Sequence, residues 1–228
     1  MMKSKYFGRF LICVLAVCLT LALVTSSHAV TYKKGFTYQK LTTGQQKAMT
    51  GVSYPKKGAK IAFSELRSVQ VKYMNFKGET KMGTLIVNKK IAKKTAQIFY
   101  ELYKIKYPIQ RIETIDKYGA NDTKSMMANN TSAFNYRLIA GSSKLSNHGK
   151  GLAIDINPRI NPCVKNGKVE PSNGKVYKNR NVKKCKGKYK KYMIHKNDKV
   201  YKIFKKYGFS WGGDWNSLKD YQHFEYVG

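Results

Sequence analysis

Cysteine is scarce in this chain of 228 residues, which contains only four. This excludes a disulfide-dense miniprotein and a small zinc module built on four cysteines in the folded part. Acidic residues are also few, since 12 Asp and Glu stand against 44 Lys and Arg, for a net charge of +32. Such an excess of one sign implies surroundings that are anionic.

The apolar content excludes a disordered chain. Hydrophobic residues make up 42% of the sequence and aromatic residues 13%. Disordered chains lack the apolar area that is needed to offset the entropy of ordering. A length of 228 residues suggests one domain, or one domain with an appendage. The positive charge is therefore carried by a folded protein.

Residues 1–29 have the pattern of a secretory signal peptide. Lys3, Lys5 and Arg9 precede an apolar run at 10–24, and Ala29 offers a small residue for cleavage. An uncleaved anchor is the alternative, but a spanning helix needs about 20 apolar residues. No second long apolar run follows. We therefore predict a secreted protein, extracellular or associated with the cell wall, that meets the membrane only through its signal peptide.

Two cysteines, Cys163 and Cys185, would remain after cleavage. The net charge would fall from +32 to +29, because the signal holds three basic residues and no acidic ones. In an oxidising exterior we expect the two cysteines to pair, closing a loop for about 3 kcal/mol in the chain-entropy model. Two unpaired thiols are the alternative.

The positive charge is densest at 165–196, where 12 Lys and Arg oppose the single acid Glu170. Basic residues mixed with tyrosines can bind nucleic acid through phosphates and stacking. The large excess of lysine over arginine favours a diffuse coat instead. We therefore interpret 162–197 as a solvated basic loop pinned by the disulfide. We expect anionic cell-wall polymers as partners, and no specific nucleic acid.

Periodicity predicts an α+β fold, with a small, mostly antiparallel sheet flanked by helices. Residues 30–65 are polar without a sustained period and are expected to form an N-terminal arm or linker. Strands, helices and irregular segments alternate without a regular β-α repeat, which argues against a doubly wound sheet. Strands are expected at 66–76, 84–87, 109–115, 152–156 and 223–227, helices at 91–105 and 199–207, and loops at 116–135 and 209–215.

Two of the three histidines beyond the signal lie in chemically rich motifs. His148 belongs to S-N-H-G-K-G-L-A-I-D, which ends at Asp155, and His223 belongs to D-Y-Q-H-F-E. A catalytic zinc commonly takes three ligands of the His, Asp or Glu type and leaves a fourth position for water. Asp155 lies in an apolar strand, where a metal would offset the cost of a buried carboxylate. On spacing alone, a surface histidine and a turn aspartate remain the alternative.

Both motifs resemble those of the VanY-like zinc D-alanyl-D-alanine carboxypeptidases, which are related to D-Ala-D-Ala dipeptidases and L-alanyl-D-glutamate endopeptidases. Residues 146–155 match S-x-H-x-x-G-x-A-x-D at every fixed position, and 220–225 match D-x-x-H-F-E. The resemblance covers roughly 66–227. It implies one catalytic domain at 66–228, of the Hedgehog/D,D-peptidase type.

The resemblance also implies roles for individual residues. His148, Asp155 and His223 would bind Zn²⁺, which lowers the pKa of its bound water and polarises the scissile carbonyl. Asp220 would be the general base that takes a proton from the attacking water. Glu225 is the alternative base, and its other possible role is to orient a ligand histidine.

Two further residues match positions of the family upstream of the first ligand. Arg137 would hold a substrate carboxylate or stabilise the tetrahedral oxyanion, with an ordinary surface arginine as the alternative. Ser146 would bond to the substrate or fix its own loop.

The expected function is that of a monomeric secreted zinc peptidase that removes terminal D-alanine from peptidoglycan stem peptides. Three alternatives stay open: an endopeptidase of the L-Ala-D-Glu type on the same site, a noncatalytic basic module that binds the cell wall, and, from the charge alone, a nuclease. The basic loop at 162–197 departs from familiar members of the family. It leaves the position of the cut open.

Overall fold

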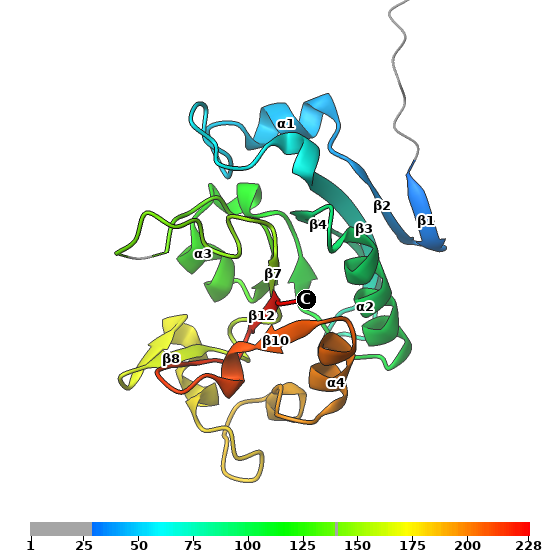
Figure 1. The fold of residues 1–228 in the computed structure, drawn as a ribbon. Helices are drawn as coiled ribbons and strands as arrows, with labels where there is room; N and C mark the ends of the chain where they lie inside the picture. The colour runs from blue at the N-terminus through cyan, green and yellow to red at the C-terminus, as the bar shows by residue number, and fades with distance from the viewer. Residues whose placement is uncertain (1–28, 140) are drawn as a thin grey trace, which may run out of the picture.

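The computed structural model describes residues 29–139 and 141–228 (Figure 1). Helices and small, largely antiparallel sheets are combined in one body, so the predicted α+β class is confirmed. The predicted signal peptide at 1–29 lies outside the described residues except for Ala29. Within 29–139 and 141–228, none of the helices has the length and apolar character that crossing a membrane requires.

The largest sheet is antiparallel and lies in the N-terminal half of the chain (Figure 1). Its four strands, in spatial order, are β1 (Val30–Lys33), β2 (Phe36–Lys40), β3 (Leu66–Met74) and β4 (Thr80–Asn88). The strands expected at 66–76 and 84–87 are present, and the second begins four residues earlier than expected.

The expectation of an arm or linker at 30–65 does not hold, because β1, β2 and helix α1 (Thr43–Met49) lie there. Strand β2 pairs with β3, and the Phe36 side chain is 2% exposed in the main core. The partner strand lies almost 30 residues further on. This pairing is a tertiary contact that local periodicity does not reveal.

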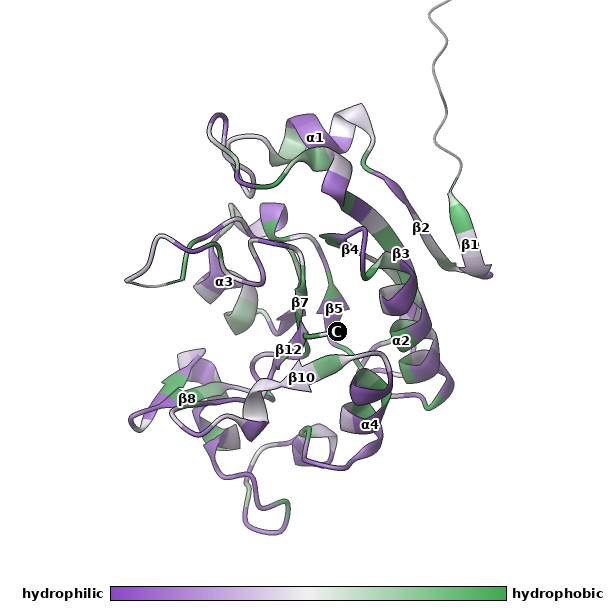
Figure 2. Cartoon of the chain, viewed as in Figure 1, coloured by the Kyte–Doolittle hydropathy of each residue, from purple (hydrophilic) through white to green (hydrophobic). Residues whose placement is uncertain are grey.

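Helix α2 (Ala92–Lys104) packs across the large sheet, mainly against β3. Its bounds lie within one residue of the helix expected at 91–105, and its N-cap is Ile91. Asn88 accepts a hydrogen bond from the backbone N–H of Lys90. The opposite face of α2 is hydrophilic and carries lysines (Figure 2). The buried face consists of Ala92, Thr95, Ala96, Ile98, Phe99 and Leu102.

A second antiparallel sheet lies at the centre of the molecule (Figure 1). Its strands, in spatial order, are β10 (Phe209–Trp211), β12 (His223–Tyr226) and β7 (Ala153–Asp155). The apolar side chains of Ile154 and Phe224 are fully buried and fix the register of β7 against β12. Helix α4 (Lys199–Lys206) packs on β10 and is capped by Asp198, which accepts from the N–H of Tyr201.

The stretch expected to be a polar loop at 116–135 has more structure than predicted. It contains helix α3 (Asp122–Met127) and strand β6 (Asn130–Thr131), which pairs in parallel with β5 (Arg111–Ile112). Short 3-10 helices lie at Phe63–Glu65, Ile115–Tyr118, Ser172–Lys178, Lys190–Tyr192 and Gly212–Asp214.

The basic segment at 162–197 is also more ordered than a loop. It opens with the hairpin of β8 (Cys163–Lys165) and β9 (Lys168–Glu170). Strand β8 pairs on its other side with β11 (Lys219–Asp220), where the second histidine motif begins. The basic segment therefore contributes a wall next to that motif.

The predicted disulfide is wrong, because Cys163 and Cys185 are both free thiols. Cys163 lies in β8, directly opposite Asp220 of β11. Cys185 is buried in a separate cluster with Ile160, Tyr177 and Met193. The two thiols thus belong to different packing environments. Neither the spacing of the two cysteines nor the expected oxidising exterior could reveal this.

Arg180 holds the basic segment in place of a covalent bond. Its guanidinium donates four hydrogen bonds and lies 4.4 Å from the ring centroid of Tyr221. The acceptors are the carbonyl oxygens of Ile160, Tyr177 and Ile194 and Oδ1 of Asn161. Burial lowers the pKa of Arg180 to about 10. A cation–π contact of this kind is worth about 2 kcal/mol when desolvated.

The free thiols can be tested by alkylation without reductant. We expect two alkylated cysteines beyond the signal peptide after denaturation, and slow reaction in the folded protein. Cys185 is buried, and burial, with Asp220 next, raises the pKa of Cys163 to about 12, so little thiolate forms at neutral pH. Mass spectrometry before and after reduction provides the measurement. A gain of two alkylated thiols upon reduction would show that Cys163 and Cys185 form a disulfide after all.

Candidate metal centre

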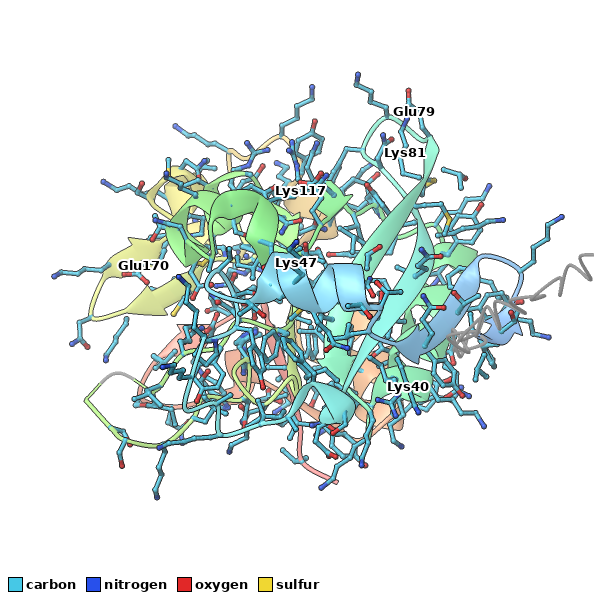
Figure 3. The ribbon with its side chains drawn as sticks, turned by 90° about the horizontal axis from the view of Figure 1, so that it is seen from above. Lys40, Lys47, Glu79, Lys81, Lys117 and Glu170 are labelled. Atoms are coloured by element: carbon cyan, nitrogen blue, oxygen red, sulfur yellow. The ribbon has the colours of Figure 1, made fainter. Side chains whose placement is uncertain are left out.

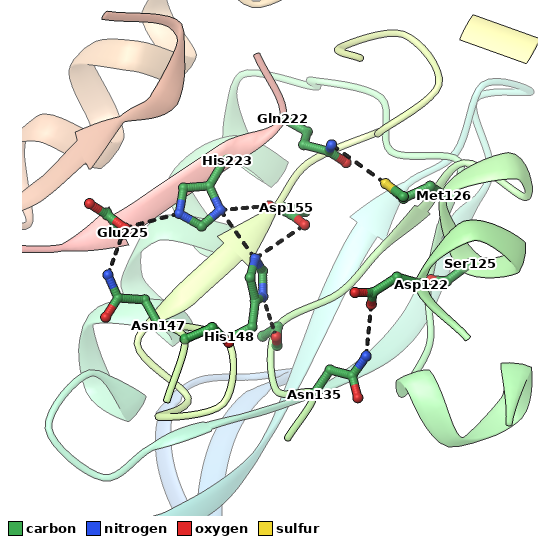
Figure 4. Close-up of polar contacts among 12 residues, drawn as sticks. Asp122, Ser125, Met126, Asn135, Asn147, His148, Asp155, Gln222, His223 and Glu225 are labelled. Carbon is green, nitrogen blue, oxygen red and sulfur yellow. Dashed lines mark hydrogen bonds and ion pairs between the residues drawn. The ribbon is translucent and has the colours of Figure 1, made fainter. Parts of the chain in front are cut away.

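The pairing of β7 with β12 brings the two histidine motifs together. Asp155 and His223 are direct partners in this register, although 68 positions separate them in sequence. His148 joins them from the loop that precedes β7 (Figure 4). Its Nε2 lies 3.1 Å from Nδ1 of His223 and 3.2 Å from a carboxylate oxygen of Asp155. One ligand atom from each residue lies within 4.8 Å of the other two.

The loop that carries His148 requires glycine at two positions. Gly151 has φ +68°, and a Cβ there would lie 2.7 Å from the backbone nitrogen of Asn88. A Cβ on Gly149 would lie 2.8 Å from the carbonyl oxygen of Arg137. Ser146 Oγ accepts a hydrogen bond from the N–H of Gly149 at 3.0 Å. Ser146 therefore fixes its own loop, one of the two roles that the resemblance allowed.

The outward hydrogen bonds of both imidazoles leave one ring nitrogen of each facing the space between His148, Asp155 and His223. His148 Nδ1 donates to the carbonyl oxygen of Ala133 at 2.6 Å, which leaves Nε2 as the free nitrogen. His223 Nε2 donates to Glu225 at 3.1 Å, so Nδ1 is the nitrogen that faces the cluster, 3.1 Å from Asp155 Oδ1 and 3.1 Å from His148 Nε2. Backbone carbonyls and carboxylates orient metal-binding histidines in this way. Two nitrogen donors and a carboxylate facing one point fit a zinc-type cation.

The electrostatics of the cluster also favour a cation. Burial opposes the charged form of His223, but hydrogen bonds to Asp155 and Glu225 outweigh it and raise its pKa to about 10. Burial likewise acts against ionised Asp155, yet the neighbouring His148 and His223 hold its pKa well below the usual range. The carboxylate is therefore ionised and available as a ligand.

The Glu225 carboxylate is hydrogen-bonded to His223. It accepts from His223 Nε2 at 3.1 Å and from Asn147 Nδ2 at 2.6 Å (Figure 4). The hydrogen bond from His223 is the main cause that lowers the pKa of Glu225. Glu225 therefore lies in the orienting role, and the geometry does not favour it as the base. Asn147 was missed in the sequence, because no spacing connects it to Glu225.

Asp220 lies in β11 and lines the same cavity as the three candidate ligands. Its Oδ1 is buried, with no hydrogen-bond partner among the described residues. Burial, followed by the Asp155 carboxylate, raises the pKa of Asp220 to about 6. A carboxyl group of this pKa beside a cation site can exchange a proton near neutral pH. Asp220 thus has an unpartnered oxygen beside the candidate ligands, whereas Glu225 is hydrogen-bonded to His223 and Asn147.

Arg137 lies at the rim of this cavity, where its side chain is 45% exposed. Its Nε donates to Asp122 at 2.7 Å, and Asp122 also accepts from Asn135 Nδ2 at 2.7 Å (Figure 4). Asp122 therefore offsets much of the charge that a substrate carboxylate would meet. Asp122 could not be predicted as a site residue, because it comes from α3 rather than from either motif.

The cavity has a volume of about 550 Å³ and brings nearly all the predicted site residues together. The size suits a short peptide segment. Cys163 also lines it, whereas Cys185 lies elsewhere in its apolar cluster. The predicted site residues that share the cavity are Arg137, Ser146, His148, Asp155, Asp220 and His223.

Substitution Glu225→Gln should weaken metal binding without removing a ligand. We expect the dissociation constant for zinc to rise about 10- to 100-fold, because the amide supports the His223 tautomer less well. Competition with a chromogenic chelator measures this constant. Glu79→Gln is the control, since Glu79 is an exposed acid paired with Lys81. Equal zinc affinities for Glu225→Gln and the control would show that Glu225 does not orient His223 for metal binding.

Comparison with known proteins gives one match. No curated protein and no solved structure matches this chain. Residues 140–226 match the model of a family described as D-alanyl-D-alanine carboxypeptidase. The matched segment contains both histidine motifs, whereas Arg137 precedes it. The resemblance to this carboxypeptidase family is thereby confirmed over 140–226.

Proposed function

We propose that the protein is a secreted zinc metallopeptidase that hydrolyses peptidoglycan stem peptides, removing the terminal D-alanine. The observation that carries the proposal is the convergence of His148, Asp155 and His223. Their ligand atoms lie within 4.8 Å of one another beside an acid with a buried, unpartnered oxygen. The match of residues 140–226 to the D-alanyl-D-alanine carboxypeptidase family supports the reaction class.

His148 Nε2, Asp155 and His223 Nδ1 would hold the zinc ion. Two imidazole nitrogens and one carboxylate form a ligand set that catalytic zinc sites use, and the fourth position remains for water. When bound there, zinc would lower the pKa of water toward about 7 and polarise the scissile carbonyl.

The chain itself supplies the proton transfers. Asp220 would accept a proton from the attacking water and return it to the leaving amine, since its pKa of about 6 allows both states near neutral pH. Asn147 and Glu225 would hold the His223 ring in one orientation throughout. Each residue thus has one task, and no group is required to be both ligand support and base.

Recognition of a terminal carboxylate would fall to Arg137. A guanidinium binds a carboxylate through paired hydrogen bonds, and Arg137 lies on the cavity that holds the candidate ligands. Its existing bond to Asp122 supports a second candidate, an endopeptidase cut within the same stem. A substrate chain that continues past the metal would need no free carboxylate at this point, so the Arg137–Asp122 pair could stay intact.

The remaining surface suits a protein that acts at the cell wall. Figure 3 shows basic side chains projecting outward around the molecule, among them Lys40, Lys47 and Lys117. Export by the predicted signal peptide would bring a chain of net charge about +29 to anionic wall polymers. We propose that it acts there as a monomer and that the charge supplies diffuse attraction rather than specific binding.

Digestion of purified muropeptides by the zinc-loaded protein, read by mass spectrometry, tests the proposal. Loss of one terminal D-alanine from pentapeptide stems supports the carboxypeptidase, and shorter stem fragments support the endopeptidase. Protein treated with chelator should leave both substrates intact. No change in any stem by protein shown to hold zinc would reject the peptidase and leave the noncatalytic wall-binding module as the account.

A further inference from the structure

A second hollow lies next to the candidate metal centre and shares its wall. It has a volume of about 460 Å³ and lies between α3 and the β8–β9 hairpin. Pro171 and Lys175, which follow the hairpin in sequence, also line it. Thr123, Met126 and Glu170 line both this hollow and the metal-centre cavity. The two spaces therefore meet along one edge and offer a continuous path for an extended chain.

An unsatisfied amide points into the cavity where it meets this edge. Gln222 is only 2% exposed, and its Oε1 is buried without a hydrogen-bond partner among the described residues. Its Nε2 has the thioether sulfur of Met126 as a partner, at 3.6 Å (Figure 4). A thioether is a weak acceptor. An unpaired buried carbonyl oxygen destabilises the folded protein, and a ligand that donates an N–H to it would relieve that cost.

The charge differs between the two ends of the path. The metal-centre cavity is lined by Asp122, Asp155, Asp220 and Glu225 as well as Glu170, and Arg137 is the one Lys or Arg among its lining residues. The second hollow is lined by Lys168 and Lys175, with Glu170 at the shared edge. A substrate carboxylate that is bound neither at the metal nor by Arg137 is therefore attracted to the second hollow, where Lys168 and Lys175 lie.

We propose that the cavity and the hollow form one groove for an extended anionic peptide, in which Gln222 Oε1 accepts a backbone N–H and Lys168 with Lys175 binds a carboxylate remote from the scissile bond. This rests on the proposed peptidase function and names its substrate more closely. The remote carboxylate corresponds chemically to that of the glutamyl residue in a peptidoglycan stem. Such a contact would let the protein select stem peptides by a residue that lies away from the scissile bond.

Two synthetic stem pentapeptides serve as probes, one with the glutamyl carboxylate free and one with it amidated. We expect Lys168→Gln/Lys175→Gln to bind the free-carboxylate probe about fivefold more weakly and the amidated probe equally well. Calorimetry with zinc-loaded protein carrying Asp220→Asn measures this without turnover. Lys183→Gln/Lys184→Gln is the matched control, since these exposed lysines of the same segment line neither space. Equal weakening by both pairs would reduce the effect to diffuse charge and overturn the proposal.

Gln222→Met tests the other proposed contact, in which Gln222 Oε1 accepts a backbone N–H of the substrate. The substitution keeps the length of the side chain and removes the unpaired oxygen. We expect KM to rise about fivefold with kcat unchanged, and the melting temperature of the metal-free protein to stay the same or rise. A lower melting temperature with an unchanged KM would show that the amide serves the fold, and it would overturn this contact.

The two claims fail in different ways. If the unsubstituted protein cleaves both probes, but neither the lysine pair nor Gln222 affects binding, the groove is rejected and the peptidase stands. If it cleaves neither probe, yet the free-carboxylate probe still binds through Lys168 and Lys175, the proposed reaction is rejected and the groove stands.

Discussion

Replacing Asp220 with asparagine should lower kcat about 10³-fold while leaving the zinc content at one ion per chain. The amide keeps the shape of the side chain but cannot take up a proton, and general acid–base catalysis contributes about 10²- to 10⁴-fold. The fold should not suffer, because Oδ1 of Asp220 is buried without a partner and its loss breaks no bond in the described part of the chain.

Steady-state hydrolysis of a stem pentapeptide, with zinc measured in the same samples, provides the test. Asp220→Glu is the informative companion, since it restores a carboxyl group at a shifted position and should recover part of the rate. Full activity in Asp220→Asn would exclude Asp220 as the base. A lost zinc ion in that variant would instead make Asp220 a ligand.

Replacing Asp155 with asparagine should weaken zinc binding by more than about 100-fold, since even residues that only orient ligands account for 10- to 100-fold. Asp155 lies between both imidazoles, and His223 Nδ1 is 3.1 Å from its carboxylate. An amide offers zinc a much poorer oxygen than a carboxylate does. Hydrolysis at limiting zinc should fall in proportion to the metal that is lost.

Zinc bound per chain after dialysis against a weak chelator measures this effect. Asp122→Asn is the matched control for metal content, because Asp122 lines the same cavity and pairs with Arg137 instead of the candidate ligands. The control should keep its zinc. Stoichiometric zinc in Asp155→Asn would place the metal elsewhere and reject the three-residue site.

The candidate ligands could be predicted because each motif carries its own chemistry. An aspartate inside the apolar run 152–156 and glycines beside His148 are local features, and the structure places both in β7 and its preceding loop. The sequence did not reveal how the motifs meet. That depends on the pairing of β7 with β12, which Ile154 and Phe224 enforce by burial.

The features that the sequence did not reveal depend on contacts between distant segments. Strand β2 is short and lies in a mostly polar stretch, and it becomes a strand because Phe36 is buried and β3 is available to pair. Asn147 reaches Glu225 only once β12 lies beside the histidine loop. Asp122 meets Arg137 only after α3 forms in a stretch that lacks helical periodicity.

The attachment of the basic segment by Arg180 has a consequence for how the protein matures. A disulfide at this point would have made the order of the segment depend on an oxidant and on the order of thiol pairing. A guanidinium that donates to three backbone carbonyls and one amide oxygen forms as the chain folds. The wall beside Asp220 can therefore assemble equally well in reducing and oxidising surroundings, and reductants should leave it intact.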